Sequence, residues 1–304
     1  MPAQALLRST KFLGEAVRET PRLAVDLAAR LQDHRRIADM PYGEGPRRRL
    51  DVYLPASLAA PRAIILYLYG GSWSSGAKEI YRFLGASLAA RGYLAVVPDY
   101  SIYPAARFPA FVEDAAEALC WTHNHAARFG ADRRRLFVMG HSAGAHIASM
   151  LAFEKRWLAA VGLDSRADLA GVIGLAGPYH FEIDTDLLRG VFGPPENKGR
   201  TQPMAYVTRD APPLLLATGE VDKTVTPRNT HDLAAAVRAA GGEVETRFYP
   251  RLGHREIIGA FSPIFSFLAP VAADVTAFIS TKTARAANTG RSGGSERGPH
   301  EPVI

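Results

Sequence analysis

The chain has 304 residues, of which 47% are hydrophobic and 22% are charged, and its formal net charge is +6. This composition is typical of a globular protein, and the length is sufficient for one large buried core. The basic runs at 47–49 and 133–135 are short and contain no aromatic residues, so we expect solvated surface there and no nucleic-acid binding. A single cysteine, Cys120, excludes an intrachain disulfide.

The sequence does not have the pattern of a leader peptide or of a membrane span. The first residues lack a long apolar core before a cleavage-like site. No segment approaches the roughly 20 uncharged apolar residues that cross a bilayer. We therefore expect a cytoplasmic protein without stable membrane insertion, and the sequence leaves its oligomeric state unknown.

The first part of the chain is predicted to be helical. Residues 5–38 have apolar and charged residues at mixed helical spacing, which favours one or two helices. We expect residues 1–40 to form a helical segment that covers the domain in part. A joint rich in turn-forming residues follows at 41–46.

Predicted strands and helices then alternate as far as residue 281. This alternation predicts an α/β fold, in which a mainly parallel central sheet is flanked by helices on both faces. We assign residues 41–281 to this domain. The predicted strands are 48–55, 63–69, 93–100, 135–140, 170–177, 212–219 and 243–250, and the predicted helices are 79–91, 110–129, 142–154, 228–240 and 263–280.

Two segments depart from the alternation. Residues 178–211 have no clear period and are expected to form a small insertion beside the functional site. Residues 282–304 are small, polar and rich in glycine, which predicts a disordered tail.

The sequence GHSAG at 140–144 fits the pattern Gly-x-Ser-x-Gly, between a short apolar strand and an alanine-rich helix. A sharp turn from strand to helix crowds the backbone, so glycines are needed at 140 and 144, where side chains would collide. The turn places the Ser142 hydroxyl clear of the sheet and near a helix N-terminus, whose dipole favours negative charge. We interpret Ser142 as a nucleophile, the alternative being a helix cap.

A serine nucleophile needs a base, and the base needs a carboxylate that orients it. The expected chain order is serine, then Asp or Glu, then histidine. Among nine histidines, His254 fits this order and lies in a loop just after the last predicted strand. Asp222 and Glu220 both follow the strand at 212–219, and we favour Asp222 because it lies further from the strand end.

The sequence YGGSW at 69–73 follows a strand and leaves its backbone unusually bare. Attack on an ester carbonyl creates an oxyanion, which needs hydrogen-bond donors aimed at it. We expect the backbone amides of Gly71, Ser72 and Ala143 to be these donors. Six residues are expected to line the substrate pocket, although aromatic residues are more often plain core. They are Tyr69, Gly70, Trp73, His141, Tyr179 and Phe181.

With these residues placed, the chain resembles the α/β-hydrolase superfamily, in the carboxylesterase branch near the hormone-sensitive-lipase-like esterases. The segments DYSIYPAARFPAFVEDA and GHSAGAHIA resemble segments of bacterial esterases, kynurenine formamidases and isoprenylcysteine methylesterases. Those families have His-Gly-Gly-x-Trp in the oxyanion loop, where this chain has Tyr69 in place of the bracing histidine. The resemblance implies hydrolysis of small-molecule esters with short to medium acyl groups, without a cofactor or a metal.

Three functions are compatible with these motifs. The first is a serine carboxylesterase that acts through an acyl-enzyme with a Ser-His-Asp triad. The second is an arylformamidase of the kynurenine formamidase kind, which the sequence does not separate from an esterase. The third is a hydrolase fold kept as a non-catalytic binding protein, which a missing triad residue would favour.

Overall fold

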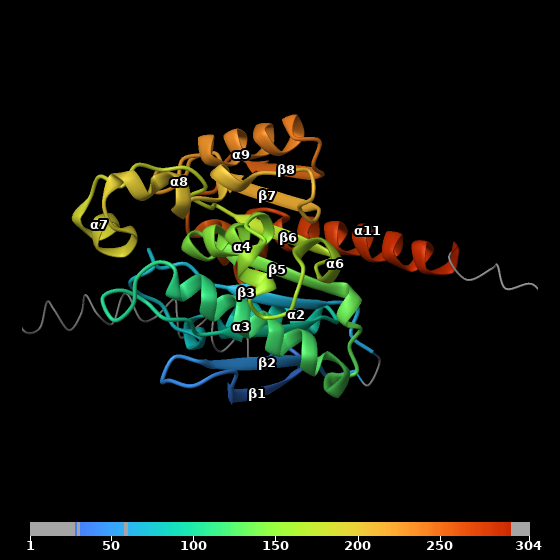
Figure 1. Ribbon diagram of the computed structural model, residues 1–304. Helices are drawn as coiled ribbons and strands as arrows, with labels where there is room; N and C mark the ends of the chain where they lie inside the picture. The colour runs from blue at the N-terminus through green and yellow to red at the C-terminus, as the bar shows by residue number, and fades with distance from the viewer. Residues whose placement is uncertain (1–27, 29–30, 58–59, 293–304) are drawn as a thin grey trace, which may run out of the picture.

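The computed structural model describes residue 28, residues 31–57 and residues 60–292, and an eight-stranded sheet lies at the centre of this part (Figure 1). The spatial order of the strands is β1-β2-β4-β3-β5-β6-β7-β8. In chain order the strands are β1 (His34–Pro41), β2 (Arg49–Pro55), β3 (Ile64–Leu68), β4 (Leu94–Pro98), β5 (Leu136–His141), β6 (Gly171–Leu175), β7 (Leu214–Gly219) and β8 (Val244–Tyr249).

Six neighbouring strands are parallel, and β1 and β2 form an antiparallel edge. The central strands β3, β4, β5, β6 and β7 are buried along their whole length, as their continuous apolar sequences require. This arrangement confirms the predicted α/β fold with a mainly parallel sheet. Because parallel strands end at the same edge, the loops after them meet at one rim of the sheet.

Helices cover both faces of the sheet (Figure 1). Tyr53 on β2 and Phe137 on β5 point to one face, where the first packs on Gly85 of α2 and the second on Phe278 of α11. The other face carries α4, which packs on α3. The longer helices are α2 (Arg82–Ala90), α3 (Ala110–His125), α4 (Ala143–Phe153), α9 (Arg228–Ala239) and α11 (Val271–Ser292).

The remaining helices are short. Figure 1 shows the insertion helices α7 and α8 projecting beyond one end of the sheet. In the described part of the chain, no helix combines the length and the apolarity that crossing a bilayer requires. The short helices are η1 (Lys78–Tyr81), η2 (Ala126–Phe129), η3 (Arg133–Arg135), α5 (Arg156–Ala159), α6 (Ser165–Asp168), α7 (Asp186–Phe192), η4 (Pro195–Asn197), α8 (Lys198–Thr201), η5 (Pro203–Tyr206), α10 (Glu256–Gly259) and η6 (Ser266–Leu268).

The helical prediction for residues 5–38 is wrong at its C-terminal end, because residues 34–41 form strand β1. This edge strand pairs with β2 and is only partly buried, so its sequence lacks the alternation of a half-buried strand. An ion pair from Arg36 Nη2 to Asp51 Oδ2, 2.7 Å long, ties the two strands together. Residues 1–27 and 29–30 lie outside the described residues, so a helical cover over the domain stays a prediction.

The tail prediction is also wrong at its start, because helix α11 continues to Ser292. Lys282 follows the predicted helix end, and its ammonium binds Glu243 Oε1 at 2.7 Å and Glu245 Oε1 at 2.9 Å. These contacts with the start of β8 hold the helix on the sheet beyond residue 280. Residues 293–304 lie outside the described residues.

Candidate active site

Ser142 stands at the sharp turn between β5 and α4 with a strained backbone, φ 54° and ψ −122°. A positive φ is uncommon for a residue other than glycine and must be held by its surroundings. Two glycines permit the turn: a Cβ at Gly140 would collide with the carbonyl of Gly144, and one at Gly144 with the carbonyl of Leu68. The Ser142 amide donates to Leu175 O on β6 at 2.9 Å, which fixes the turn against the sheet.

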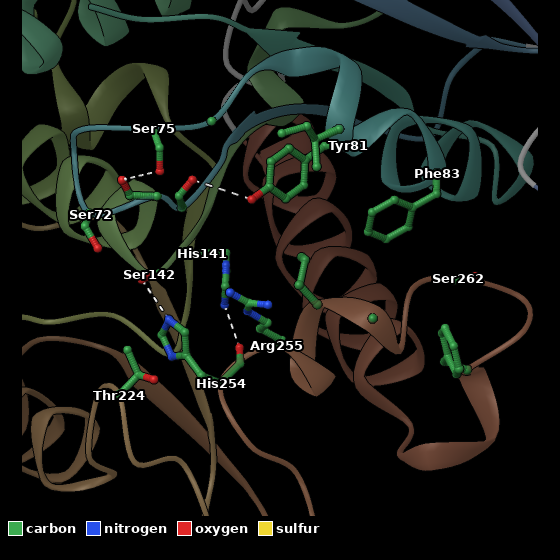
Figure 2. A pocket seen from close by; sticks show the side chains of 17 residues that line it. Ser72, Ser75, Tyr81, Phe83, His141, Ser142, Thr224, His254, Arg255 and Ser262 are labelled. Atoms are coloured by element: carbon green, nitrogen blue, oxygen red, sulfur yellow. Dashed lines mark hydrogen bonds between the residues drawn. The ribbon is translucent and has the colours of Figure 1, made fainter. Parts of the chain in front are cut away.

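His254 lies in the loop after β8, and its ring reaches Ser142 across the rim of the sheet (Figure 2). The distance from His254 Nε2 to Ser142 Oγ is 2.8 Å. On its other side, Nδ1 lies 2.8 Å from Asp222 Oδ2. Since a carboxylate only accepts, Nδ1 carries the proton, and Nε2 is left to accept the hydrogen bond from the serine hydroxyl. This arrangement can move a proton from Ser142 to His254.

Asp222 is buried in the loop after β7. Its Oδ1 accepts hydrogen bonds from the amides of Thr224, at 2.8 Å, and Val225, at 2.9 Å. Burial acts to raise the pKa of this carboxyl, but the hydrogen bonds from His254 and the two amides outweigh it and hold the pKa below its usual range. The carboxylate is therefore charged and fixed in place. Glu220, the other acid considered, is exposed at the surface.

His141 precedes the serine and supports the histidine loop. Its Nε2 donates to the backbone carbonyl of His254 at 2.8 Å (Figure 2). Burial lowers the pKa of His141 to about 4, and the neighbouring His254 acts in the same direction. A neutral His141 next to Ser142 can hold the His254 backbone without adding a charge to the site.

The loop after β3 brings to the same rim of the sheet backbone amides that have no protein acceptor among the described residues. Gly71, Ser72 and Trp73 follow one another with positive φ angles of 142°, 51° and 55°. A Cβ at Gly71 would collide with the carbonyl of Ser75, so the loop closes only with glycine there. Ala143 is the first residue of α4, where helix amides have no partner within the helix. In the described part of the chain, the amides of Gly71, Ser72 and Ala143 donate no hydrogen bond to a protein acceptor.

A network of hydrogen bonds centred on Tyr69 braces this loop. The buried Tyr69 hydroxyl donates to Asp99 Oδ1 at 2.7 Å and accepts from Arg47 Nη2 at 2.7 Å. The same nitrogen of Arg47 donates to Gly76 O at 2.8 Å, on the far side of the loop. Tyr100 completes the network, because its ring stacks on Tyr69 and its hydroxyl donates to Tyr69 O at 2.6 Å. The Tyr69 phenol thus braces the loop at the position where the families that this chain resembles have a histidine.

A cavity of about 730 Å³ opens beside Ser142 (Figure 2). Among the predicted site residues, Gly70, Gly71, Ser72, His141, Ser142 and His254 line this cavity. Much of its wall comes from elements after β3 and β8 that the sequence did not point to. These additional lining residues include Ile80, Tyr81, Phe83, Arg255, Ile258, Ser262 and Phe265.

Four aromatic residues predicted for the pocket lie elsewhere. Tyr69, Trp73, Tyr179 and Phe181 are not among the residues that line this cavity. Trp73 stands edge-on to Phe192 of the insertion, with ring centres 4.8 Å apart, and is tilted against Phe181 at 5.6 Å. Tyr179 is completely buried. Trp73 thus joins the oxyanion loop to the insertion, whereas Tyr69 braces the loop through its hydroxyl. Apolar rings of this size fill core as readily as they line a pocket.

The described residues contain no group of three or more histidine, cysteine, aspartate or glutamate side chains that could hold a metal ion.

Comparisons with known proteins place the chain among esterase relatives. Residues 50–237 match the family model described as BD-FAE. The chain is 27% identical over 238 residues to isoprenylcysteine alpha-carbonyl methylesterase from Arabidopsis thaliana, covering 71% of this chain and 56% of that protein. It is 28% identical over 264 residues to esterase LipC from Mycobacterium tuberculosis, covering 81% of this chain and 63% of that protein. The chain thus spans between half and two thirds of the length of these relatives.

The fold is shared with solved esterase structures. Esterase B from Lactobacillus rhamnosis superimposes with a TM-score of 0.76 at 18% sequence identity, covering 95% of this chain and 98% of that one. A likeness at this level of identity establishes the α/β-hydrolase fold of the chain, and its chemistry has to be argued from the site itself.

Proposed function

Because the chain belongs to the BD-FAE family, we propose that it is a serine carboxylesterase with Ser142, His254 and Asp222 as its catalytic triad. One observation carries the proposal: two hydrogen bonds of 2.8 Å link the serine to the histidine and the histidine to the aspartate. The three residues come from loops after three different strands, and such an alignment is required for a serine hydroxyl to act as a nucleophile.

In the proposed reaction, Ser142 Oγ attacks the ester carbonyl while His254 Nε2 takes its proton. The tetrahedral intermediate collapses when the imidazolium gives this proton to the leaving alcohol, and the acyl group stays on Ser142. Water then attacks the acyl-enzyme with the same histidine as base, which releases the acid and restores the serine. Asp222 holds the tautomer and stabilises the imidazolium in both halves.

The oxyanion of each tetrahedral intermediate is proposed to accept hydrogen bonds from the amides of Gly71, Ser72 and Ala143. Their lack of a protein acceptor within the described residues supports this role, because these donors remain available to an oxyanion. The loss of one such donor costs about 10²–10³ in rate.

The cavity supports substrates with short to medium acyl chains. Its volume of about 730 Å³ lies within the roughly 300–1,000 Å³ of small-molecule sites. Ile80, Phe83 and Ile258 give it apolar walls, and Gly70 and His141 line it beside the serine. Tyr69 and Trp73 act from outside the cavity by holding the oxyanion loop.

The same groups could cleave an arylformamide, so this second function stays a prediction that substrate comparison tests. A short p-nitrophenyl ester and N-formylkynurenine would be compared at equal enzyme concentration, and an ester preference is expected. The third function, a non-catalytic binding protein, is disfavoured by the aligned triad geometry.

The experiment that tests the proposal replaces Ser142 by alanine. S142A is expected to lower kcat on p-nitrophenyl butyrate by about 10⁴-fold or more and to abolish labelling by a serine-directed phosphonate. S149A is the matched control, because Ser149 is a buried serine of α4, the helix that begins after Ser142, and its hydroxyl has no hydrogen-bond partner within the described residues. Undiminished turnover by S142A would remove Ser142 from the mechanism.

A further inference from the structure

One side chain brings a fixed charge into the cavity beside Ser142. Arg255 follows His254 directly, and among the described residues that line the cavity it is the sole arginine or lysine, with no aspartate or glutamate. Figure 2 shows its side chain pointing into the cavity. The electrostatic character of the cavity therefore depends on how far this guanidinium is neutralised.

The nearby carboxylates are engaged or directed elsewhere. Asp222 is bound by His254 and by two backbone amides. Glu79 is ion-paired with Lys78. Glu256 turns back toward Gly253, where a Cβ would meet its Oε2 at 2.6 Å. No carboxylate in the described part of the chain forms an ion pair with Arg255, so its charge remains available to a ligand.

Arg255 lines the same cavity as Gly70, Gly71 and Ser72 of the oxyanion loop. Tyr81 also lines this cavity, and its hydroxyl lies 3.5 Å from Gly70 O. Burial raises the pKa of Tyr81, whereas the positive charge of Arg255 acts to lower it. Because Ser142, Tyr81 and Arg255 line the same cavity, an ester bound at Ser142 shares that cavity with the guanidinium.

Resting on the proposed esterase function, we propose that Arg255 makes this site selective for esters that carry a carboxylate or a similar anionic group. The planar guanidinium can bind a carboxylate through two parallel hydrogen bonds, while the apolar walls hold the chain that joins it to the ester. A cationic substituent would be repelled by the Arg255 guanidinium, and the described lining residues include no carboxylate that could bind it.

The test uses esters that differ in charge and are matched in length. Monomethyl adipate carries a carboxylate, methyl adipamate carries an amide of similar shape, and methyl 6-aminohexanoate carries an ammonium group. A second pair places the group on the alcohol side: the butyrate ester of 4-hydroxybutanoate and its amide. Because the ester bond is the same within each series, the ratio of kcat/KM values reports recognition of the substituent.

We expect the wild-type protein to prefer the carboxylate over the amide by about tenfold in at least one series, the size of one charge-assisted hydrogen bond. R255Q is expected to bring this carboxylate-to-amide ratio close to one. R255E is expected to make the carboxylate ester a poorer substrate than the amide and to favour the ammonium ester. The preference should also shrink at high ionic strength, since a long-range charge effect is screened. R251Q is the matched control, because Arg251 is exposed in the same loop and does not line the cavity.

Two results would overturn the inference: equal rates for carboxylate and amide in both series, or a carboxylate preference that R255Q and R255E leave unchanged. Either result would leave the esterase proposal intact, because the neutral amide esters report ester hydrolysis by themselves. If neither these esters nor p-nitrophenyl butyrate were hydrolysed, the esterase proposal would fail instead. In that case, a binding measurement with free adipate and adipamide would still decide whether Arg255 recognises anions.

Discussion

The hydroxyl of Tyr69 donates a hydrogen bond of 2.7 Å to Asp99 Oδ1, and this contact joins the oxyanion loop to the end of β4. Burial raises the pKa of Asp99, while the hydrogen bonds from Tyr69 and from the Lys78 amide act to lower it. Because Arg47 binds the same hydroxyl and also Gly76 O, one phenol connects both ends of the loop. The position of the oxyanion-loop amides thus depends on Tyr69, a side chain that does not line the cavity.

Removal of the Tyr69 hydroxyl is expected to displace the oxyanion loop while the protein remains folded. In Y69F, Asp99 and Arg47 lose their shared partner, and the unfolding free energy is expected to fall by about 1–3 kcal/mol. We expect kcat on a neutral ester to fall about tenfold, with KM nearly unchanged, because the donors act on the transition state. Urea denaturation and steady-state kinetics measure the two effects.

Y249F is the matched control for this change. Tyr249 also donates to a carboxylate, Asp274 Oδ2, at 2.8 Å, but it lies away from the oxyanion loop. A similar loss of stability with an unchanged kcat is expected. If Y69F and Y249F affected kcat equally, Tyr69 would have no special role in positioning the loop.

Much of the fold could be predicted because buried parallel strands have continuous apolar sequences. The edge strand β1 could not, because its stability comes from pairing with β2 and from the contact of Arg36 with Asp51, which join distant parts of the sequence. The same reason explains the end of α11, where Lys282 binds acids at the start of β8. Tertiary contacts between polar residues leave no periodic pattern in the sequence, so they do not help to predict where an element begins or ends.

The candidate triad could be predicted from chain order and strand ends, since parallel strands bring their loops to one rim. The cavity wall could not, because Phe83 and Ile258 belong to helices whose position over the site is set by packing. Residue type was a poor guide as well, since Tyr179 and Phe181 are as apolar as a pocket wall and pack elsewhere. Arg255 went unnoticed beside His254 because a charged loop residue is ordinarily solvated.

The choice between the two acids of the β7 loop has a direct test. D222N would place an amide beside His254 Nδ1 and favour the wrong tautomer, so kcat is expected to fall by about 10³–10⁴. E220Q should change kcat by less than about threefold, because Glu220 is exposed and the contact to His254 comes from Asp222. The opposite ranking of the two variants would mean that Glu220 orients the base.

The oxyanion loop can also be tested at its glycine. G71A would need a φ of 142° and would collide with the Ser75 carbonyl, so the loop must shift. We expect kcat to fall by about 10²–10³, the effect of losing an oxyanion donor. G162A is the control, because Gly162 has a φ of 75° but open space around it, and it lies away from the site. If both variants kept full activity, the Gly71 amide would have no part in the reaction.

The buried His146 is expected to make the unfolding free energy fall as the pH drops into mild acid. It is fully buried in α4, its Nε2 donates to Thr201 O at 2.8 Å, and its ring meets Trp73 edge-on. Burial lowers its pKa to about 4 from the ordinary 6.5, although the contact with Thr201 acts to raise it. Between these values the unfolded chain binds the extra proton, so the unfolding free energy falls as the pH drops.

This shift corresponds to a loss of about 2 kcal/mol between pH 7 and pH 5 from His146 alone. H146Q keeps a donor for Thr201 O but cannot titrate, so its stability should fall with acid by about 2 kcal/mol less than that of the wild type. Urea midpoints at half-unit pH steps measure the difference. H231Q is the control, because His231 lies exposed on α9. Equal acid sensitivity in the wild type and H146Q would show that His146 is not held neutral by burial.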